Sequence, residues 1–339
     1  MEYKYIGTSG LRVTPICLGT MTFGQMSSKK ESFKIMDKAY DAGINFFDNA
    51  EMYPVPPRAD LVGLSEEIMG EWMKDKPRES IIVATKVAGA ANGRFAAPVR
   101  HGLTAIDRFH IERGIEGSLK RLKTDYIDLY QVHWPDTVIP LEESMEAMDR
   151  LVKAGKVRYI GASNDTAYGL TKATEISRYK GFARFQSIQN NFSLNEPRFF
   201  DELAHICRQE KISLLPYSPL AGGVLTGKYQ GGVIPKGSRF EEYLAKDLPR
   251  LNAMKKRFIN DKTLAATARY MQIAQEHGMS ITTLAAAWSK HWDFVASTII
   301  GARTAEQLDE SLKALDITLS DEIIQACKKV QEEIMYPMG

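Results

Sequence analysis

The stretches IIVATK (residues 81–86), YIDLYQVH (126–133) and VRYIGAS (157–163) decide the fold, because each is a short run rich in β-branched and aromatic residues. Such runs are typical of buried strands. The segments between them have a helical period: IERGIEGSLKRLKTD, for example, repeats apolar residues at 111, 115, 119 and 122. Strand and helix therefore alternate, as in parallel α/β folds.

Five more runs repeat this pattern along the chain, so we expect eight strand-helix units. The further runs are TPICLGT (14–20), NFFDNA (45–50), RFQSIQ (184–189), ISLLPYS (212–218) and VASTIIG (295–301). Most intervals between successive runs are close to the ~30 residues of one βα unit. Eight such units predict a closed (β/α)8 barrel, the TIM barrel of the α/β class.

Three segments depart from the repeat. Residues 1–13 alternate around a Ser-Gly pair and predict a β-hairpin that covers one end of the barrel. Long loops follow the third strand, at 87–109, and the seventh, from Tyr217 to about residue 260, and long loops in compact domains often carry function. No linker is evident, so residues 1–339 should form a single barrel domain. A doubly wound nucleotide-binding sheet is disfavoured because no turn carries GxGxxG.

Composition excludes several classes of protein. The 339 residues are 44% hydrophobic and 25% charged, which is average for globular proteins and argues against disorder or a coiled coil. The net charge is +2, and no basic run suggests a nucleic-acid partner. Cys17, Cys207 and Cys327 are too dispersed for a disulfide framework. With no signal peptide or membrane span evident, we expect a soluble cytoplasmic protein.

Polar side chains follow several of the predicted strands, at or just after the last residue. In a (β/α)8 barrel the carboxyl ends of all strands meet at one face, which forms the active-site mouth. One polar residue after a strand is usually only part of a loop, but a set at several strands indicates a site. The set comprises Asp48, Lys86, His133, Ser163, Asn164, Gln189 and Tyr217.

Asp48, Tyr53, Lys86 and His133 form a chemically coherent group at this face. A phenol is a weak proton donor at neutral pH unless a nearby cation favours its ionised form, and Lys86 can supply that cation. Asp48 would neutralise the buried ammonium, and His133 could donate a hydrogen bond to a carbonyl oxygen. The same residues also fit an ordinary buried ion pair and a core histidine.

Over almost its full length the sequence resembles the aldo-keto reductase superfamily, with the motifs in the family's order. The stretch AEMYPVPPR (50–58) is similar to the bacterial Tas-type branch, near the potassium-channel β-subunit type. The motifs are LGTMTFG (18–24), GINFFDNAEMY (43–53), ATK (84–86), DYIDLYQVHWPD (125–136), GKVRYIGASN (155–164), YSPLAGGVLTGKY (217–229) and IIGARTAEQLDESL (299–312).

This resemblance implies roles for the residues that match the family's motifs. Asp48, Tyr53, Lys86 and His133 match the catalytic tetrad. The channel β subunits carry Asn where this chain has His133, so the histidine favours a working enzyme over a purely regulatory subunit.

The resemblance also implies NADP(H) lying extended across the barrel mouth. Tyr217 matches the ring that stacks on the nicotinamide, and Ser163, Asn164 and Gln189 match the residues that hold its amide. Gly19, Thr20, Met21 and Asp48 match further contacts of the first two strands. The positions that resemble the family's pyrophosphate loop are Ser218, Pro219, Leu220, Gly222, Lys228 and Arg239.

The end of the last strand resembles the family's adenosine-phosphate site. Arg303 lies beside an expected helix start, where its planar side chain could grip a 2′-phosphate, and this favours NADPH over NADH. Thr304 and Gln307 also fit a capping box, which would explain Gln307 without a ligand. The matching positions are Gly301, Arg303, Gln307, Glu310 and Ser311.

The resemblance implies NADPH-dependent reduction of aldehydes or ketones, with a small-molecule carbonyl substrate and Tyr53 as the acid. Two rivals stay open: an NADP(H)-binding regulatory subunit with little turnover, and a barrel hydrolase or lyase that uses Asp48 and Lys86 differently. GGVLTGKY resembles a P-loop but has Tyr229 where magnesium binding needs Ser or Thr. No HExxH or paired-ligand spacing predicts a metal site. The pattern specifies neither one substrate nor an oligomeric state.

Overall fold

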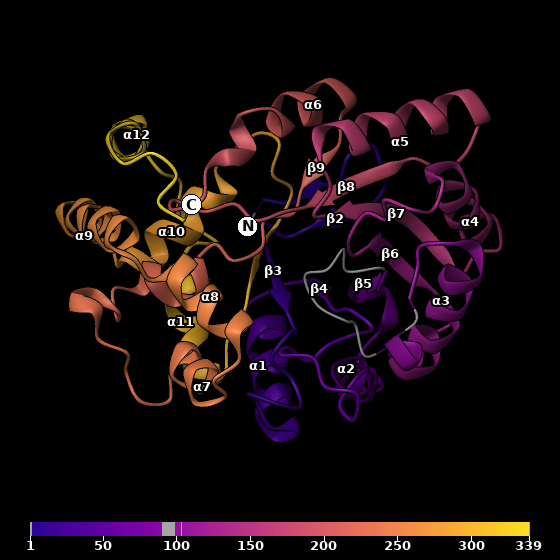
Figure 1. Cartoon of the computed structure of the whole chain (residues 1–339), viewed down its shortest axis with the longest axis horizontal. Coiled ribbons are helices and arrows are strands. Elements are labelled where there is room, and N and C mark those ends of the chain that lie inside the picture. The colour runs from indigo at the N-terminus through magenta and orange to yellow at the C-terminus, as the bar shows by residue number, and fades with distance from the viewer. Residues whose placement is uncertain (1, 90–98, 103, 339) are drawn as a thin grey trace.

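Eight short parallel strands form one curled sheet, and each lies within or beside one of the eight predicted runs (Figure 1). The computed structural model describes residues 2–89, 99–102 and 104–338. The strand order is β10-β3-β4-β5-β6-β7-β8-β9. The strands are β3 (Ile16–Gly19), β4 (Phe46–Asp48), β5 (Ile82–Val87), β6 (Ile127–Val132), β7 (Val157–Ser163), β8 (Phe185–Gln189), β9 (Ser213–Leu214) and β10 (Thr298–Ile300).

Backbone contacts between the first and last strands of this order close the sheet into a barrel. Leu214 and Val295 form a parallel bridge. The N–H of Ala296 donates to the carbonyl of Leu214 at 3.1 Å, and that of Ile299 donates to Pro216 at 2.8 Å. The predicted (β/α)8 barrel is therefore confirmed.

Helices surround the barrel, and most begin at a side chain that accepts from the first turn. Ser28, Asp107, Thr166 and Ser320 each accept a backbone N–H in this way. Figure 1 shows α3 to α6 along one side and α7 to α12 gathered on the other. The helices around the repeat are α1 (Lys29–Asp41), α2 (Leu64–Met73), α3 (Arg108–Leu122), α4 (Leu141–Lys153), α5 (Ala167–Lys180), α6 (Leu203–Glu210), α9 (Asp261–Glu276), α10 (Ile281–Lys290), α11 (Asp309–Lys313) and α12 (Asp321–Glu333). None of the helices in the described ranges is long and apolar enough to span a membrane.

The long connection predicted after the seventh strand is present, and it carries structure that was not predicted. It contains two helices, α7 (Arg239–Ala245) and α8 (Pro249–Phe258). Ser238 caps α7, and the ring of Phe240 packs against Phe258 with centroids 5.7 Å apart. The many Gly and Pro residues before α7 hid this apolar pairing. Short 3-10 helices are η1 (Arg78–Ser80), η2 (Val99–Gly102), η3 (Arg198–Phe200), η4 (Ala221–Thr226), η5 (Gln230–Gly232) and η6 (Ala305–Leu308).

The long connection predicted after the third strand is described only in part. Residues 90–98 and 103 lie outside the described ranges, and the remainder carries η2.

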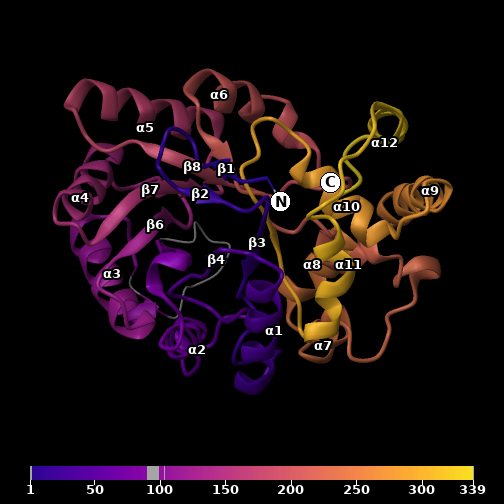
Figure 2. The same ribbon diagram turned by 180° about the vertical axis from the view of Figure 1, so that it is seen from behind.

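The predicted hairpin is present as β1 (Lys4–Tyr5) paired antiparallel with β2 (Arg12–Val13). It covers the end of the barrel where the strands begin, beside β8 (Figure 2). The N–H of Thr8 donates to Oε1 of Gln186 at 2.8 Å, and that of Gly7 donates to Oγ of Ser213 at 2.8 Å. Apolar hairpin side chains join the core inside the barrel. The polar side chains lie at the opposite end, where the strands finish.

Gly7 lies close against the barrel, and we expect Gly7→Ala to destabilise the fold. Its φ is +57°, and a Cβ there would lie 2.5 Å from the carbonyl oxygen of Gln186. Left-handed strain of ~1–2 kcal/mol and overpacking of ~1–3 kcal/mol should together lower the free energy of unfolding by about 2–5 kcal/mol. Urea titration measures this change.

Gly155→Ala is the matched control, because Gly155 has φ +73° with no atom within 4 Å of the added Cβ. It should lose only the strain, about 1–2 kcal/mol. Equal losses in the two variants would show that the hairpin contact is not tight.

Candidate active site

Four side chains predicted to act together converge at the end of the barrel where the strands finish. Asp48 is the last residue of β4, Lys86 lies in β5, and His133 directly follows β6. Tyr53 lies in the connection after β4, and all four are buried. The parallel pairing of β4, β5 and β6 brings these ends side by side.

The ammonium of Lys86 is the centre of the group. It is fully buried and donates to Oδ2 of Asp48 at 2.6 Å, to the carbonyl of Asn49 at 2.7 Å and to the hydroxyl of Tyr53 at 3.3 Å. All three ammonium protons therefore have acceptors, which offsets the cost of burying the charge. The contact with Asn49 is through its backbone, which the sequence could not indicate.

These contacts keep Lys86 charged. Burial opposes the charge, but Asp48 and Tyr53 outweigh it and raise the pKa of Lys86 above its ordinary value. Burial also raises the pKa of Tyr53, and although Lys86 lowers it as expected, the cation does not outweigh burial and the charge of Asp48. The cation of Lys86 thus acts in the expected direction, and it limits an increase in the pKa of Tyr53 that burial causes.

His133 is neutral at physiological pH. Burial, with a smaller effect of Lys86, holds its pKa well below the ordinary range. Its ring lies edge-on to Tyr53 with centroids 5.8 Å apart and stacks on Trp134 at 3.8 Å. A neutral imidazole has one N–H, with which it can donate one hydrogen bond.

Two amides hold the second oxygen of Asp48. Gln189 donates to Oδ1 at 2.9 Å, and Gln131 donates to it at 3.2 Å. Gln131 was not predicted, although it lies beside Lys86 in the sheet register and is a polar residue within a buried strand. The polar Gln131 near the end of the buried run YIDLYQVH was the feature of the sequence that could have indicated its role.

Ser163, Asn164 and Tyr217 form a hydrogen-bonded wall beside this group. Nδ2 of Asn164 donates to the carbonyl of His133 at 3.0 Å, and the hydroxyl of Tyr217 donates to Oδ1 of Asn164 at 2.8 Å. Ser163 donates to the carbonyl of Gln189 at 2.8 Å. Asn164 and Ser218 both have φ +55°. Such left-handed residues often mark functional sites.

Three cations gather where β9 and β10 lead into helices. Burial lowers the pKa of Lys228, and the nearby charges of Arg239 and Arg303 lower it further. Arg303 pairs with Glu242 of α7 and donates to the carbonyl of Gly237 at 2.6 Å. One carboxylate balances only part of this charge, so the cluster suits a phosphorylated ligand.

The other predicted cofactor contacts are spread around the same face. The Thr20 hydroxyl donates to the carbonyl of Asp48 at 3.0 Å. The predicted capping box is absent: Thr304 makes no capping hydrogen bond, and Oε1 of Gln307 instead accepts the N–H of Arg303 at 2.9 Å. Gly19 ends β3, Met21 follows it, Pro219 and Leu220 precede η4, Gly222 lies in η4, Gly301 follows β10, and Glu310 and Ser311 lie in α11.

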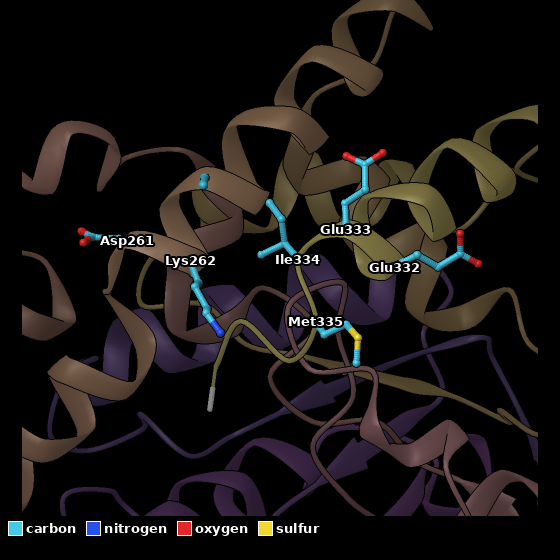
Figure 3. Close-up of a pocket in the computed structure, with 7 residues that line it drawn as sticks. Asp261, Lys262, Glu332, Glu333, Ile334 and Met335 are labelled. Atoms are coloured by element: carbon cyan, nitrogen blue, oxygen red, sulfur yellow. The ribbon is translucent and has the colours of Figure 1, made fainter.

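A separate surface hollow lies between the start of α9 and the end of α12 (Figure 3). The carboxylates of Asp261 and Glu332 point in different directions there, so its charges do not converge. Within the described ranges, no cluster of three or more His, Cys, Asp or Glu residues could hold a metal ion. The polar groups of the barrel mouth therefore form the stronger candidate.

Sequence comparison agrees with this geometry. The sequence pattern of the aldo/keto reductase family matches residues 15–332. The chain belongs to the aldo/keto reductase family. It is 37% identical over 357 aligned positions to Protein tas of Escherichia coli, covering 99% of each chain. It is also 35% identical to the oxidoreductase YrpG of Bacillus subtilis, covering 96% of this chain and 94% of that one. Identity is again 35% to a rice protein named "Probable voltage-gated potassium channel subunit beta", over 97% and 96% of the two chains.

We expect Lys86→Met to destabilise the protein, because it leaves the Asp48 carboxylate buried without its cation. Breaking a buried pair from one side costs about 3–5 kcal/mol. Since the folded state raises the pKa of Lys86, its contribution is complete below the ordinary value of 10.5 and is lost as the pH rises further. Urea unfolding at neutral pH and above 10.5 should show the difference between variant and wild type shrinking.

Lys153→Met is the control for this prediction. Lys153 also pairs with an aspartate, Asp149, but its own side chain is exposed. The control should lose at most about 1 kcal/mol. A Lys86→Met difference that stayed constant with pH would contradict the assigned charge state.

Proposed function

We propose that this chain reduces aldehydes or ketones to alcohols with NADPH. The observation that carries the proposal is the contact of the Lys86 ammonium with both Asp48 and the Tyr53 hydroxyl at the barrel mouth. Membership of the aldo/keto reductase family supports an oxidoreductase. The specific cofactor, the carbonyl substrate and the acid role of Tyr53 are the proposed part.

The residues of the site divide the work of such a reaction. When bound, NADPH would supply the hydride that reaches the carbonyl carbon. The Tyr53 hydroxyl gives its proton to the carbonyl oxygen, so that the C=O bond becomes an alcohol. Lys86 stabilises the phenolate that remains, and neutral His133 donates a hydrogen bond that orients the oxygen.

The chain offers a matching group to each part of the cofactor. Lys228, Arg239 and Arg303 supply positive charge for the phosphates. Tyr217, held by Asn164, offers a ring face for the nicotinamide, and the Ser163 hydroxyl and the amide side chains of Asn164 and Gln189 offer hydrogen bonds for its carboxamide. We also propose that the enzyme is cytoplasmic, because its three buried free thiols fit a reducing compartment. The proposal does not depend on the oligomeric state.

A regulatory NADP(H)-binding subunit is the second candidate, because one relative's name describes a potassium channel subunit. Following NADPH absorbance with a panel of aldehydes, ketones and quinones separates the two. Rapid, substrate-dependent loss of NADPH supports the reductase. Tight NADPH binding without turnover on any compound supports the subunit, and failure to bind NADPH contradicts both.

We expect Tyr53→Phe to remove the proton donor while NADPH binds almost as tightly as in wild type. General acid catalysis contributes about 10²–10⁴ to the rate, so kcat should fall by that factor. Steady-state kinetics and fluorescence titration measure the two quantities. Tyr40→Phe is the control, because the Tyr40 hydroxyl contacts Ser80 far from the tetrad. Turnover above about a tenth of wild type would transfer the acid role to another residue, first to His133.

Arg303→Ala should weaken NADPH binding selectively, because NADH lacks the 2′-phosphate that the arginine would hold. A charged hydrogen bond of ~1.5–3 kcal/mol corresponds to roughly 10-fold to 150-fold in affinity. Lys228→Ala should weaken both cofactors by similar factors, since its pyrophosphate contact is common to them. Fluorescence titration of each variant with NADPH and NADH gives the constants.

Glu242→Gln controls for the ion pair that Arg303 makes in this structure. It removes the pair but keeps the guanidinium, so NADPH affinity should hold or rise. If Arg303→Ala and Glu242→Gln both lowered the two affinities alike, Arg303 would act by fastening α7, and the case for NADPH would lose its main residue.

A further inference from the structure

Glu51 lies between Asp48 and Tyr53 in the chain, yet its carboxylate makes none of the contacts of the tetrad. Only 3% of the side chain is exposed. Oε1 accepts the N–H of Ala88 at 2.5 Å, and Oε2 pairs with Nη1 of Arg100. The backbone N–H of Glu51 donates to the carbonyl of Lys86 at 3.2 Å. Glu51 thus joins the connection that carries Tyr53 to the end of β5.

Arg100 completes a closed ring of contacts around Ala88. Its Nη2 donates to the carbonyl of Ala88 at 2.8 Å, while Glu51 takes the N–H of the same residue. Both backbone groups of Ala88 are therefore held by one ion pair, two positions after Lys86. Arg100, from the connection after β5, and Glu51, from the connection after β4, therefore both bind the backbone of Ala88.

The Glu51–Arg100 ion pair also places an apolar side chain against Tyr53. Val99, next to Arg100 in η2, packs with Ala50, Met52, Tyr53 and Ala88 in one cluster of buried residues. An ion pair has a defined geometry, whereas apolar contacts alone tolerate sliding. The pair therefore fixes where Val99 and the chain around Tyr53 meet.

Burying this pair is costly, which argues that it has a purpose. Burial raises the pKa of Glu51, and Arg100 opposes that increase. The hydroxyl of Tyr130 and the carboxylate of Glu66 also lie in this charged neighbourhood. An apolar pair of similar size would often be as stable as a buried ion pair. Its directional contacts with Ala88 offer a reason for the charge.

We propose that Glu51 and Arg100 are positioning residues, which hold the Tyr53 hydroxyl at the Lys86 ammonium by clamping Ala88. Neither residue touches the reacting atoms. The inference rests on the proposed reductase function, in which the position of the Tyr53 proton sets the rate. A displacement of about 1 Å at a reacting group can cost on the order of 100-fold in rate.

The test compares Arg100→Met with Arg78→Met. Arg78 pairs with the buried carboxylate of Asp128, is about as exposed as Arg100 and also donates to backbone carbonyls, those of Ile81 and Tyr126. These contacts lie where β5 and β6 begin, at the opposite end of the barrel from Tyr53. We expect Arg100→Met to lower kcat roughly 10-fold to 100-fold, with the Kd for NADPH unchanged. Arg78→Met should lose stability without that loss of kcat. Arg100→Lys should recover part of kcat, and Glu51→Gln should resemble Arg100→Met.

Two outcomes overturn the inference. Arg100→Met could keep the kcat of Arg78→Met, or its kcat and NADPH affinity could fall together, as expected for general loss of structure. Hydrogen exchange by mass spectrometry gives a reading that needs no turnover. Amides of 48–54 and 84–89 should exchange faster in Arg100→Met than in Arg78→Met. Equal exchange contradicts the clamp, whereas an inactive wild type contradicts only the reductase proposal.

Discussion

A charged lysine inside the barrel is the constraint on which the rest of the site depends. An ammonium away from water is stable only when acceptors surround it, and here Asp48, Asn49 and Tyr53 provide them. Because Lys86 belongs to a strand with neighbours on both sides, its place is fixed by the sheet. The acceptors must therefore come to the lysine: Asp48 does so from the end of β4, and Asn49 and Tyr53 from the connection that follows it.

The two ends of the barrel differ: the hairpin closes one end, and the polar side chains of the tetrad lie at the other. The hairpin covers the end where the strands begin, with apolar residues that continue the core and polar ones that bond to Gln186 and Ser213. The tetrad lies at the other end, where the strands finish. A ligand that enters there meets the tetrad first at Tyr53 and His133, whereas Lys86 stays fully buried. In the proposed reaction, Tyr53 would therefore give its proton to a substrate bound at that face.

Much of the fold could be predicted because its signals are local. Each strand run and each helical period occupies a short window, and the parallel barrel then brings the ends of β4, β5 and β6 together. The failures were of two kinds. Gly and Pro residues hid α7 and α8, whose stability comes from aromatic contacts such as that of Phe240 with Phe258. The pairs Gln131–Asp48 and Arg100–Glu51 join residues far apart in sequence. The sequence shows Gln131 as a polar residue in a buried strand, but it does not show which residue is its partner.

The stretch from the end of β4 to Tyr53 contains both a residue that could be recognised from the sequence and one that could not. Asp48 is polar at a strand end and so could be recognised, whereas Glu51 has the same chemistry three residues later and could not. Asp48 faces the lysine of β5, and Glu51 reaches an arginine from the connection that follows β5. Tyr53 therefore lies at the end of a short stretch of chain that contains two carboxylates, those of Asp48 and Glu51. Each carboxylate is paired with a cation from another part of the chain. In the proposed reaction Tyr53 is an acid that must hold its proton at one place, beside a fixed ammonium. Two such ion pairs would serve that role better than tighter apolar packing, because ion pairs resist both sliding and rotation.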